Sequence, residues 1–273
     1  MNRERIAFIG AGNMARALAG GLLRAGARAA DLIATDPVAL QRKQIEALGI
    51  AATDDNAKAI EGATVVVLAV KPQVMRGVVE ALAPSVTQDQ LVISIAAGIP
   101  THAIERWLAH ARPLVRCMPN TPALYGVGIT ALYANGAVTK RQAALAESVL
   151  AAAGEVVWVA NEDQLDAVTA VSGSGPAYYF YLMEAMQRAA RALGLDDDLA
   201  RKLTLATALG AAVMAKESGE RVEQLRKNVT SPGGTTERAI SVLDARDASA
   251  AFEDAIAAAA ARSRELASGV GGS

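Results

Sequence analysis

The chain has 273 residues, which suits one large domain or two modest ones, and the aromatic content of 4% means that its core is built from small aliphatic side chains. The formal net charge is −1 and no block of like charge stands out, which argues against a surface for nucleic acid or for anionic membranes. No signal-peptide pattern opens the chain, and Gly and Pro interrupt its charge-free stretches, so we expect no membrane span and a cytoplasmic location.

The first part of the chain alternates short apolar runs with segments that carry helix signals. The predicted strands are Ile6–Ile9, Leu32–Thr35, Val65–Val70, Leu91–Ile95, Leu114–Cys117, Gly128–Leu132 and Val156–Val159. Strands rich in Val and Ile that alternate with helices predict parallel β-α-β units, with a sheet buried on both faces.

After about Asn161 the strand signal disappears and long helices are predicted at Ala177–Leu193, Asp197–Lys216 and Asp247–Leu266. We therefore predict an α/β chain of two domains: a Rossmann-type dinucleotide-binding domain over residues 1–160, and an all-helical domain over residues 161–273. The helix from Ala177 has large apolar groups on every side, which predicts that a second subunit covers it. A compact bundle with the first two of these helices at its centre is the alternative.

A glycine fingerprint opens the chain. Gly10-Ala11-Gly12-Asn13-Met14-Ala15 follows the first predicted strand directly and starts a helix, as the dinucleotide-binding pattern G-x-G-x-x-G/A requires. Gly10 permits the tight turn, Gly12 lets the backbone approach a pyrophosphate at the helix N-terminus, and Ala15 keeps the helix close to the sheet. The pattern predicts a site for NAD(P)H.

Two further strand ends carry candidates for the same site. Asp36 lies 21 residues after Ala15, where a carboxylate can hold ribose hydroxyls. Because Pro37 follows it, Asp36 is also a good helix N-cap, and both roles can hold together. Val70-Lys71-Pro72 ends another strand and faces the cofactor, unless Lys71 is a solvated loop residue and Pro72 only starts the next helix.

Two segments in the helical part are rich in Gly and hydroxyl side chains, Ser172–Pro176 and Thr230–Thr236, and a helix is predicted after each. Backbone N–H groups and hydroxyls at a helix N-terminus favour a ligand carboxylate, although capped interhelical turns are the alternative.

The residues that could carry proton or metal chemistry are few. The histidines, His102 and His110, are expected to be solvated, so no base is placed to move the proton of an alcohol, whereas reduction of a C=N bond needs chiefly hydride positioning. The single cysteine, Cys117, fits a reducing compartment and a buried structural thiol rather than a nucleophile. These three residues lack the spacing of metal ligands, so no metal site is predicted.

Together these segments resemble the pyrroline-5-carboxylate reductase family. The matching blocks occur in the family's order: Phe8–Ala15, Val70–Pro72, Ala96–Gly98, Arg116–Pro122, Val171–Tyr178 and Asn228–Thr236. The resemblance implies NAD(P)H-dependent reduction of 1-pyrroline-5-carboxylate to L-proline, the last step of proline biosynthesis. It also implies a helical dimerisation domain that interlocks with a second subunit, in a homodimer or a higher assembly of dimers, with active sites across the interface.

The fingerprint and the resemblance together predict the site residues. Cofactor binding is expected of Gly10, Ala11, Gly12, Asn13, Met14, Asp36, Asn56, Val70, Lys71, Pro72, Ala97 and Asn228. Substrate binding is expected of Ser172, Ser174, Gly175, Gly233, Gly234, Thr235 and Thr236. Ser174 and Thr236 are the expected catalytic residues, with Thr236 donating to the ring nitrogen. Asp36 departs from the small hydroxyl residue or Asn of many relatives, and because its charge would repel a 2′-phosphate, the choice between NADPH and NADH stays open.

Two rival functions remain at this stage. A β-hydroxyacid dehydrogenase shares the opening motif and a helical second domain, but it should carry a lysine about one turn after the first Ser/Gly-rich segment, where this chain has Ala177-Tyr178-Tyr179-Phe180. A regulatory module that only senses a nucleotide would need no second ligand pocket.

Overall fold

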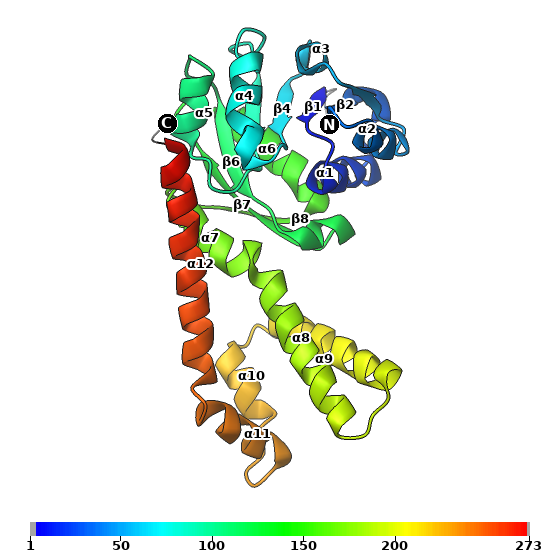
Figure 1. Ribbon diagram of the computed structural model, residues 1–273, viewed down its shortest axis with the longest axis vertical. Helices are drawn as coiled ribbons and strands as arrows, with labels where there is room; N and C mark the ends of the chain where they lie inside the picture. Colours follow the sequence, from blue (N-terminus) through cyan, green and yellow to red (C-terminus); the bar gives the residue numbers. More distant parts are fainter. Residues whose placement is uncertain (1–3, 272–273) are drawn as a thin grey trace. The chain divides into compact units, whose positions relative to one another are not determined.

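The computed structural model describes residues 4–271, and within them eight strands form one sheet in the order β3-β2-β1-β4-β5-β6-β7-β8 (Figure 1). The strands are β1 (Ile6–Ile9), β2 (Leu32–Thr35), β3 (Ala51–Thr53), β4 (Val65–Leu68), β5 (Leu91–Ser94), β6 (Leu114–Met118), β7 (Gly128–Ala134) and β8 (Gly154–Trp158). All seven predicted strands are present. The missed strand, β3, has three residues at the sheet edge and no run of Val or Ile, so it left no pattern to detect.

Strand direction departs from the prediction at one place. Neighbours from β3 to β6 pair in parallel, but β7 runs antiparallel to β6, and β8 is parallel to β7. The connection from β6 to β7 contains only the short 3₁₀ turn η2 (Thr121–Tyr125), which is too short for a helical crossover, so the chain turns back. The expectation of an all-parallel sheet was therefore wrong at β7.

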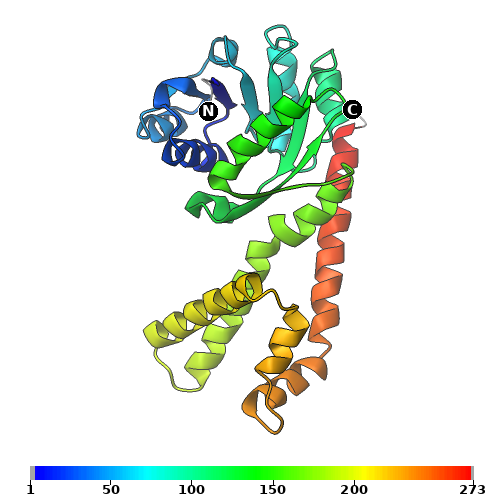
Figure 2. The same cartoon turned by 180° about the vertical axis from the view of Figure 1, so that it is seen from behind.

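Helices cover both faces of the sheet. They are α1 (Asn13–Arg24), α2 (Ala39–Glu46), α3 (Asn56–Ile60), α4 (Pro72–Leu82), α5 (Thr101–Trp107) and α6 (Lys140–Leu150), with the 3₁₀ turns η1 (Ala29–Asp31) and η3 (Ala151–Ala153). One face packs against α1 and α6 and the other against α4 and α5; α6 is seen in front of the sheet in Figure 2.

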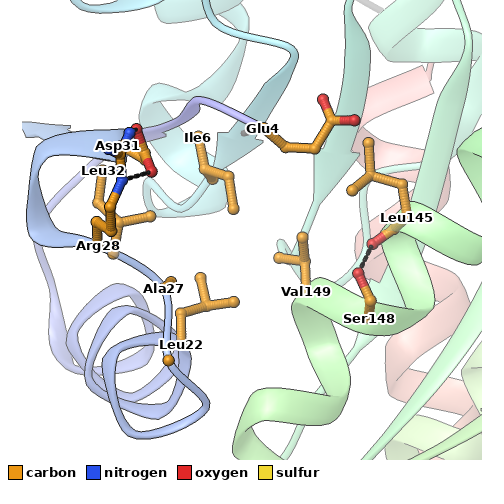
Figure 3. Close-up of a pocket in the computed structure, with 11 residues that line it drawn as sticks. Glu4, Ile6, Leu22, Ala27, Arg28, Asp31, Leu32, Leu145, Ser148 and Val149 are labelled. Atoms are coloured by element: carbon orange, nitrogen blue, oxygen red, sulfur yellow. Dashed lines mark hydrogen bonds and ion pairs between the residues drawn. The ribbon is translucent and has the colours of Figure 1, made fainter. Parts of the chain in front are cut away.

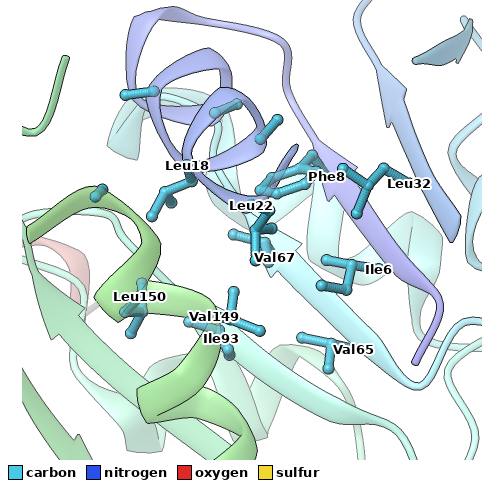
Figure 4. Packing of buried hydrophobic residues seen from close by; sticks show 14 of the residues in the cluster. Ile6, Phe8, Leu18, Leu22, Leu32, Val65, Val67, Ile93, Val149 and Leu150 are labelled. Carbon is cyan, nitrogen blue, oxygen red and sulfur yellow. The ribbon is translucent and has the colours of Figure 1, made fainter. Parts of the chain in front are cut away.

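The core follows from alternation along the strands. In β1, Ile6 and Phe8 face the α1–α6 side (Figure 4), whereas Ala7 and Ile9 face the α4–α5 side, and all four are buried. Burial of each large aliphatic side chain contributes about 1.5–3 kcal/mol. The strands therefore have apolar residues on both faces, the pattern that predicted a doubly covered sheet.

The chain forms two compact units, residues 1–174 with 259–273, here called the sheet unit, and residues 175–258, here called the helical unit. The boundaries differ from the predicted division at residue 160. Helix α7 (Gln164–Val168) packs on β6 and β7, and in the same unit the buried Ser263 hydroxyl donates to Oδ1 of the buried Asp166 at 2.6 Å. These long-range contacts place both ends of the predicted helical domain in the sheet unit.

The helical unit contains α8 (Gly175–Ala192), α9 (Asp197–Glu217), α10 (Val222–Asn228), α11 (Thr235–Asp244) and the first residues of α12 (Ala248–Gly271). The three predicted long helices correspond to α8, α9 and α12. Large apolar side chains of α8 and α9 remain exposed, such as Tyr181 at 67% and Leu209 at 68%. In the described part of the chain, no helix combines the length and apolarity needed to cross a membrane.

Two neighbouring glycines of α1 allow a matched test of its packing. A Cβ at Gly21 would lie 2.1 Å from the Ala152 carbonyl oxygen, whereas at Gly20 it would meet only the flexible Arg24 side chain at 3.5 Å. We expect Gly21→Ala to lower the free energy of unfolding by roughly 1–3 kcal/mol, because backbone must move. Gly20→Ala should raise it by up to about 1 kcal/mol through helix propensity. Urea unfolding measures the free energy of unfolding of both variants. Equal changes in this free energy would contradict the close contact between α1 and η3.

Candidate functional site

The turn after β1 can be formed only by glycine. Gly10 has φ +102°, and a Cβ on it would lie 2.7 Å from the carbonyl oxygen of Ala69, just after β4. Its N–H donates to the Thr35 carbonyl at the end of β2 (2.8 Å). The turn is thus fixed between the end of β2 and the end of β4, the two strands that flank β1, and it directs the chain into α1.

The N-terminus of α1 is open. Its N-cap, Gly12, has an ordinary φ of −68°, makes no side-chain cap, and would meet no protein atom within 4 Å if it carried a Cβ. Neither the backbone nor the packing therefore requires glycine here, whereas a pyrophosphate bound against the loop would. The first-turn residues Asn13 and Met14 lie at this helix start. The Arg16 guanidinium stabilises the loop by donating to Asn13 Oδ1 (2.5 Å) and to the Ala11 carbonyl (2.8 Å). This arrangement fits a bound dinucleotide.

Asp36 links the glycine loop to the next turn. Its Oδ2 accepts from the Ala11 N–H (3.0 Å), and its Oδ1 accepts from the Val38 N–H (2.9 Å). The expected N-cap role is wrong in its detail, because α2 begins at Ala39 with Val38 as its N-cap, so Asp36 closes a turn before the helix. Arg42 donates to the Asp36 carbonyl (2.6 Å) and lies 4.0 Å from Asp54 Oδ2, which places a cation at this turn.

The other cofactor-binding candidates of the sheet unit gather at the same edge. Val70, Lys71 and Pro72 follow β4, the parallel neighbour of β1, and Ala97 follows β5, the parallel neighbour of β4, so the carboxyl ends of these strands lie at one edge of the sheet. Pro72 begins α4, as one of the two interpretations predicted, and Lys71 is exposed. Asn56 begins α3, and its Oδ1 accepts from the Thr35 hydroxyl (2.5 Å).

The first Ser/Gly-rich segment is not a free helix N-terminus. Residues Thr169–Gly173 form a single π-helical turn that joins α7 to α8, and the Ser174 N–H donates to the Thr169 carbonyl (2.8 Å). The Ser172 hydroxyl donates to the Val168 carbonyl (3.0 Å), which leaves it only acceptor capacity. The expectation of a free helix entry was wrong here, because the π-turn precedes α8 and only the bend at Ser174 separates the two. Isolated π-turns are frequent at functional sites.

The second segment, in the helical unit, does open a helix. Helix α11 starts at Thr235 after the N-cap Gly234, which provides no side-chain cap, and Glu237 accepts instead from the Gly233 N–H (2.7 Å). Thr235 and Thr236 are therefore the first two helical residues, and Thr236 is half-buried. The first-turn N–H groups of such a helix can bind a carboxylate.

Asn228 also belongs to the helical unit. Its side chain donates to Glu220 Oε2 (2.9 Å) and accepts from Gln224 Nε2 (2.7 Å). The amide nitrogen and the amide oxygen of Asn228 thus each have a partner within the helical unit. Gly175, the first residue of α8, is buried.

The remaining reactive side chains have structural surroundings. Burial raises the pKa of the Cys117 thiol far above its ordinary value, and the thiol donates to the Ser94 carbonyl (3.3 Å), which agrees with the predicted structural role. His102 and His110 are exposed, as predicted.

Sequence reasoning missed Glu162, which joins three parts of the sheet unit. Its carboxylate accepts from the Thr101 N–H (2.7 Å), the Thr101 hydroxyl (2.6 Å) and the buried Arg116 guanidinium (2.9 Å). It thereby caps α5, which follows the loop that contains Ala97, from 61 residues away. The available signal was Arg116, because a charge inside an apolar strand requires a buried partner.

One cavity of about 360 Å³ lies away from this edge (Figure 3). It is lined by α1, α6 and the residues that precede β1 and β2, including Glu4, Arg28 and Asp31. These residues lie at the amino ends of the strands, whereas the glycine loop lies at the carboxyl ends. The cavity is therefore separate from the nucleotide-binding edge.

Two family models match the chain. The model described as pyrroline-5-carboxylate reductase dimerisation matches residues 162–266, and the model described as NADP oxidoreductase coenzyme F420-dependent matches residues 5–98. A pyrroline-5-carboxylate reductase from Pseudomonas aeruginosa is 52% identical over 272 residues, which is 99% of this chain and 100% of that protein. The chain belongs to the pyrroline-5-carboxylate reductase family.

Solved structures agree with this family. The pyrroline-5-carboxylate reductase from Coxiella burnetii superposes with a TM-score of 0.91 at 47% identity, covering 97% of this chain and 99% of that one. The pyrroline carboxylate reductase from Plasmodium falciparum, solved with NADP bound, has a TM-score of 0.89 at 28% identity and covers 98% and 99%. The Rossmann-type sheet followed by a helical dimerisation domain is thus the fold of the family, as the sequence predicted.

Two glycines of the loop should separate folding from nucleotide binding. We expect Gly12→Ala to change the free energy of unfolding by less than about 1 kcal/mol and to weaken NADPH binding at least about tenfold, because the new methyl enters ligand space only. Gly10→Ala should destabilise the fold itself, since it combines a positive φ with a backbone clash. Calorimetric titration with NADPH and urea unfolding measure both effects. Unchanged affinity in Gly12→Ala would contradict this placement of the pyrophosphate.

Proposed function

We propose that this chain catalyses the NAD(P)H-dependent reduction of 1-pyrroline-5-carboxylate to L-proline, the last step of proline biosynthesis. The observation that carries the proposal is the open N-terminus of α1 behind Gly12, in a chain that is 52% identical to a pyrroline-5-carboxylate reductase over its whole length. A dinucleotide at this edge would be held by the glycine loop, Asp36, Asn56, Val70–Pro72 and Ala97. Asn228 is proposed as a further cofactor-binding residue. The bound cofactor would supply the hydride.

The substrate offers a carboxylate and a ring C=N bond. The N–H groups at the start of α11, with Gly233, Gly234 and Thr235, suit the carboxylate, because the positive end of the helix dipole favours an anion. Ser172, Ser174 and Gly175 are proposed to line the remainder of the substrate site. As the C=N bond is reduced, an electron pair develops on the ring nitrogen, and the Thr236 hydroxyl is proposed to donate to it, with Ser174 as the second catalytic hydroxyl.

Cofactor choice should depend on the corner formed by Asp36 and Arg42. The Asp36 carboxylate disfavours a 2′-phosphate and can accept from a ribose hydroxyl, whereas the neighbouring Arg42 guanidinium attracts the phosphate. We propose that the two charges offset one another, so that both NADPH and NADH are used.

Self-association is supported by the dimerisation family model over residues 162–266. We propose a homodimer, or a higher assembly of dimers, in which a second copy covers the exposed apolar side chains of α8 and α9. These side chains include Tyr179, Phe180, Tyr181, Leu182, Leu203, Leu209 and Val213. We further propose a cytoplasmic location, because the single unpaired cysteine fits a reducing compartment. We also propose that the protein has no nucleic-acid partner.

The activity itself can be tested together with Thr236. The purified protein should oxidise NADPH or NADH with 1-pyrroline-5-carboxylate, and far more slowly with a β-hydroxyacid pair. Thr236→Val should lower kcat on the order of 10²-fold, because it removes a donor to developing charge, while Thr236→Ser should retain most of the rate. Steady-state kinetics decide this, and equal turnover of a β-hydroxyacid would overturn the proposed reaction. An unchanged kcat in Thr236→Val would contradict the catalytic role of Thr236 and leave it only a structural role at the start of α11.

The role of Asp36 is tested by Asp36→Asn, which removes the charge and keeps an acceptor oxygen for only one of the Ala11 and Val38 N–H groups. We expect the NADPH/NADH ratio of kcat/KM to rise about tenfold, because one charge that repels a 2′-phosphate near the protein surface is removed. Asp36→Ser should shift the ratio in the same direction. If the ratio stays constant in both variants, Asp36 does not influence cofactor choice and only stabilises the glycine loop and the turn before α2.

Assembly can be tested on the wild-type protein. We expect light scattering after size exclusion, at micromolar concentration, to give at least the mass of two chains, twice 28.1 kDa. Leu209→Asp should shift the distribution toward the monomer, because a charge would be buried in the interface. A folded and active wild-type monomer would exclude the proposed interface.

A further inference from the structure

The π-turn between α7 and α8 contains a carbonyl that the helix cannot satisfy. In an α-helix, the Ser172 carbonyl would accept from the N–H of the residue four positions further along. That residue is Pro176, which has no N–H. A donor from elsewhere in the chain is therefore needed, because unpaired backbone groups away from water are unfavourable.

Asn120 supplies this donor. Its Nδ2 donates to the Ser172 carbonyl at 3.2 Å, and its Oδ1 accepts from the Ile129 N–H at 3.0 Å. Because the Ile129 N–H can only donate and the Ser172 carbonyl can only accept, the two bonds define the orientation of the amide. Asn120 follows β6 and Ile129 lies in β7, so the amide is anchored on the sheet.

The π-turn also lies close to the end of β6. A Cβ at Gly173 would come within 2.5 Å of the Met118 methyl group, so the backbone of the turn packs directly on this side chain. Together with the Asn120 bond, this contact sets the position of the turn, which contains Ser172 and is followed directly by Ser174.

We propose that Asn120 is a positioning residue for the substrate site: by donating to the Ser172 carbonyl it keeps the π-turn in the conformation that presents Ser174. This inference rests on the proposed function, in which Ser172 and Ser174 line the substrate site. Loss of the donor leaves the carbonyl unpaired, and the turn shifts toward conformations in which the carbonyl reaches water. Binding of 1-pyrroline-5-carboxylate is then weakened, while the glycine loop is untouched.

The test uses Asn120→Asp in the full-length enzyme. Aspartate keeps the acceptor for the Ile129 N–H but has no donor for Ser172. We expect the KM for 1-pyrroline-5-carboxylate to rise about tenfold, as loss of a hydrogen bond to a part-buried carbonyl implies, with the KM for NADPH within about twofold of wild type. Adding Pro176→Ala, which provides an N–H for the Ser172 carbonyl, should lower the substrate KM again.

Asn135 offers a control away from the π-turn. Its Nδ2 donates to the Arg112 carbonyl (2.8 Å) and to Glu105 Oε1 (2.5 Å), and its Oδ1 accepts from the Leu114 N–H (3.1 Å), at the amino end of β6. Asn135→Asp removes these donors and places a carboxylate beside Glu105, so it should lower Tm at least as much as Asn120→Asp and leave both KM values unchanged. If Asn120→Asp does not fold, Asn120→Ser, which also removes the amide donor without adding charge, is measured by the same criteria.

The outcomes separate the two proposals. Wild-type enzyme that fails to reduce 1-pyrroline-5-carboxylate overturns the proposed function before any variant is measured. With an active wild type, an unchanged substrate KM in the Asn120 variant, a parallel rise in the NADPH KM, or a rise in the Asn135 control as well would each overturn the positioning role. A selective rise that Pro176→Ala reverses supports it.

Discussion

The approach of the Gly10 turn to the end of β4 is the constraint on which the nucleotide-binding edge depends. Any side chain at residue 10 would collide with the backbone of Ala69, and the positive φ of this residue sends the chain directly from β1 into α1. The position of Ala11, and thus its hydrogen bond to Asp36, follows from the same turn.

The two proposed ligand-binding helices begin in the same way. Helices α1 and α11 both start after a glycine N-cap that makes no side-chain hydrogen bond, whereas Asp55, Thr139 and Asp196 cap α3, α6 and α9 with their side chains. A side-chain cap would occupy N–H groups that an anion needs. Helices α2, α5 and α10 also lack a cap from the side chain of their N-cap residue, but α1 and α11 combine this with a glycine N-cap, so no N-cap side chain stands in front of their first-turn N–H groups.

The errors of prediction share a cause. Strands with long Val and Ile runs were recognised, but β3 was not, because its three residues have no side chains typical of a buried strand. The Ser172–Gly175 segment has the composition of a loop, yet it is helical, since Asn120 and the Met118 side chain stabilise a π-turn that composition cannot indicate. Glu162 was missed because its partners, Thr101 and Arg116, lie far from it along the chain.

By itself the sequence determined the family, the Rossmann-type sheet, the positions of the long helices and the residues at the strand ends, because these depend on periodicity and on local motifs. Only the tertiary structure decided the reversal of β7, the return of α12 to the sheet unit through Ser263 and Asp166, and the hydrogen-bond partners of Asp36 and Ser172. Each of these depends on which donors and acceptors meet across long stretches of chain. Such pairings are set by packing, which leaves no periodic trace in the residues themselves.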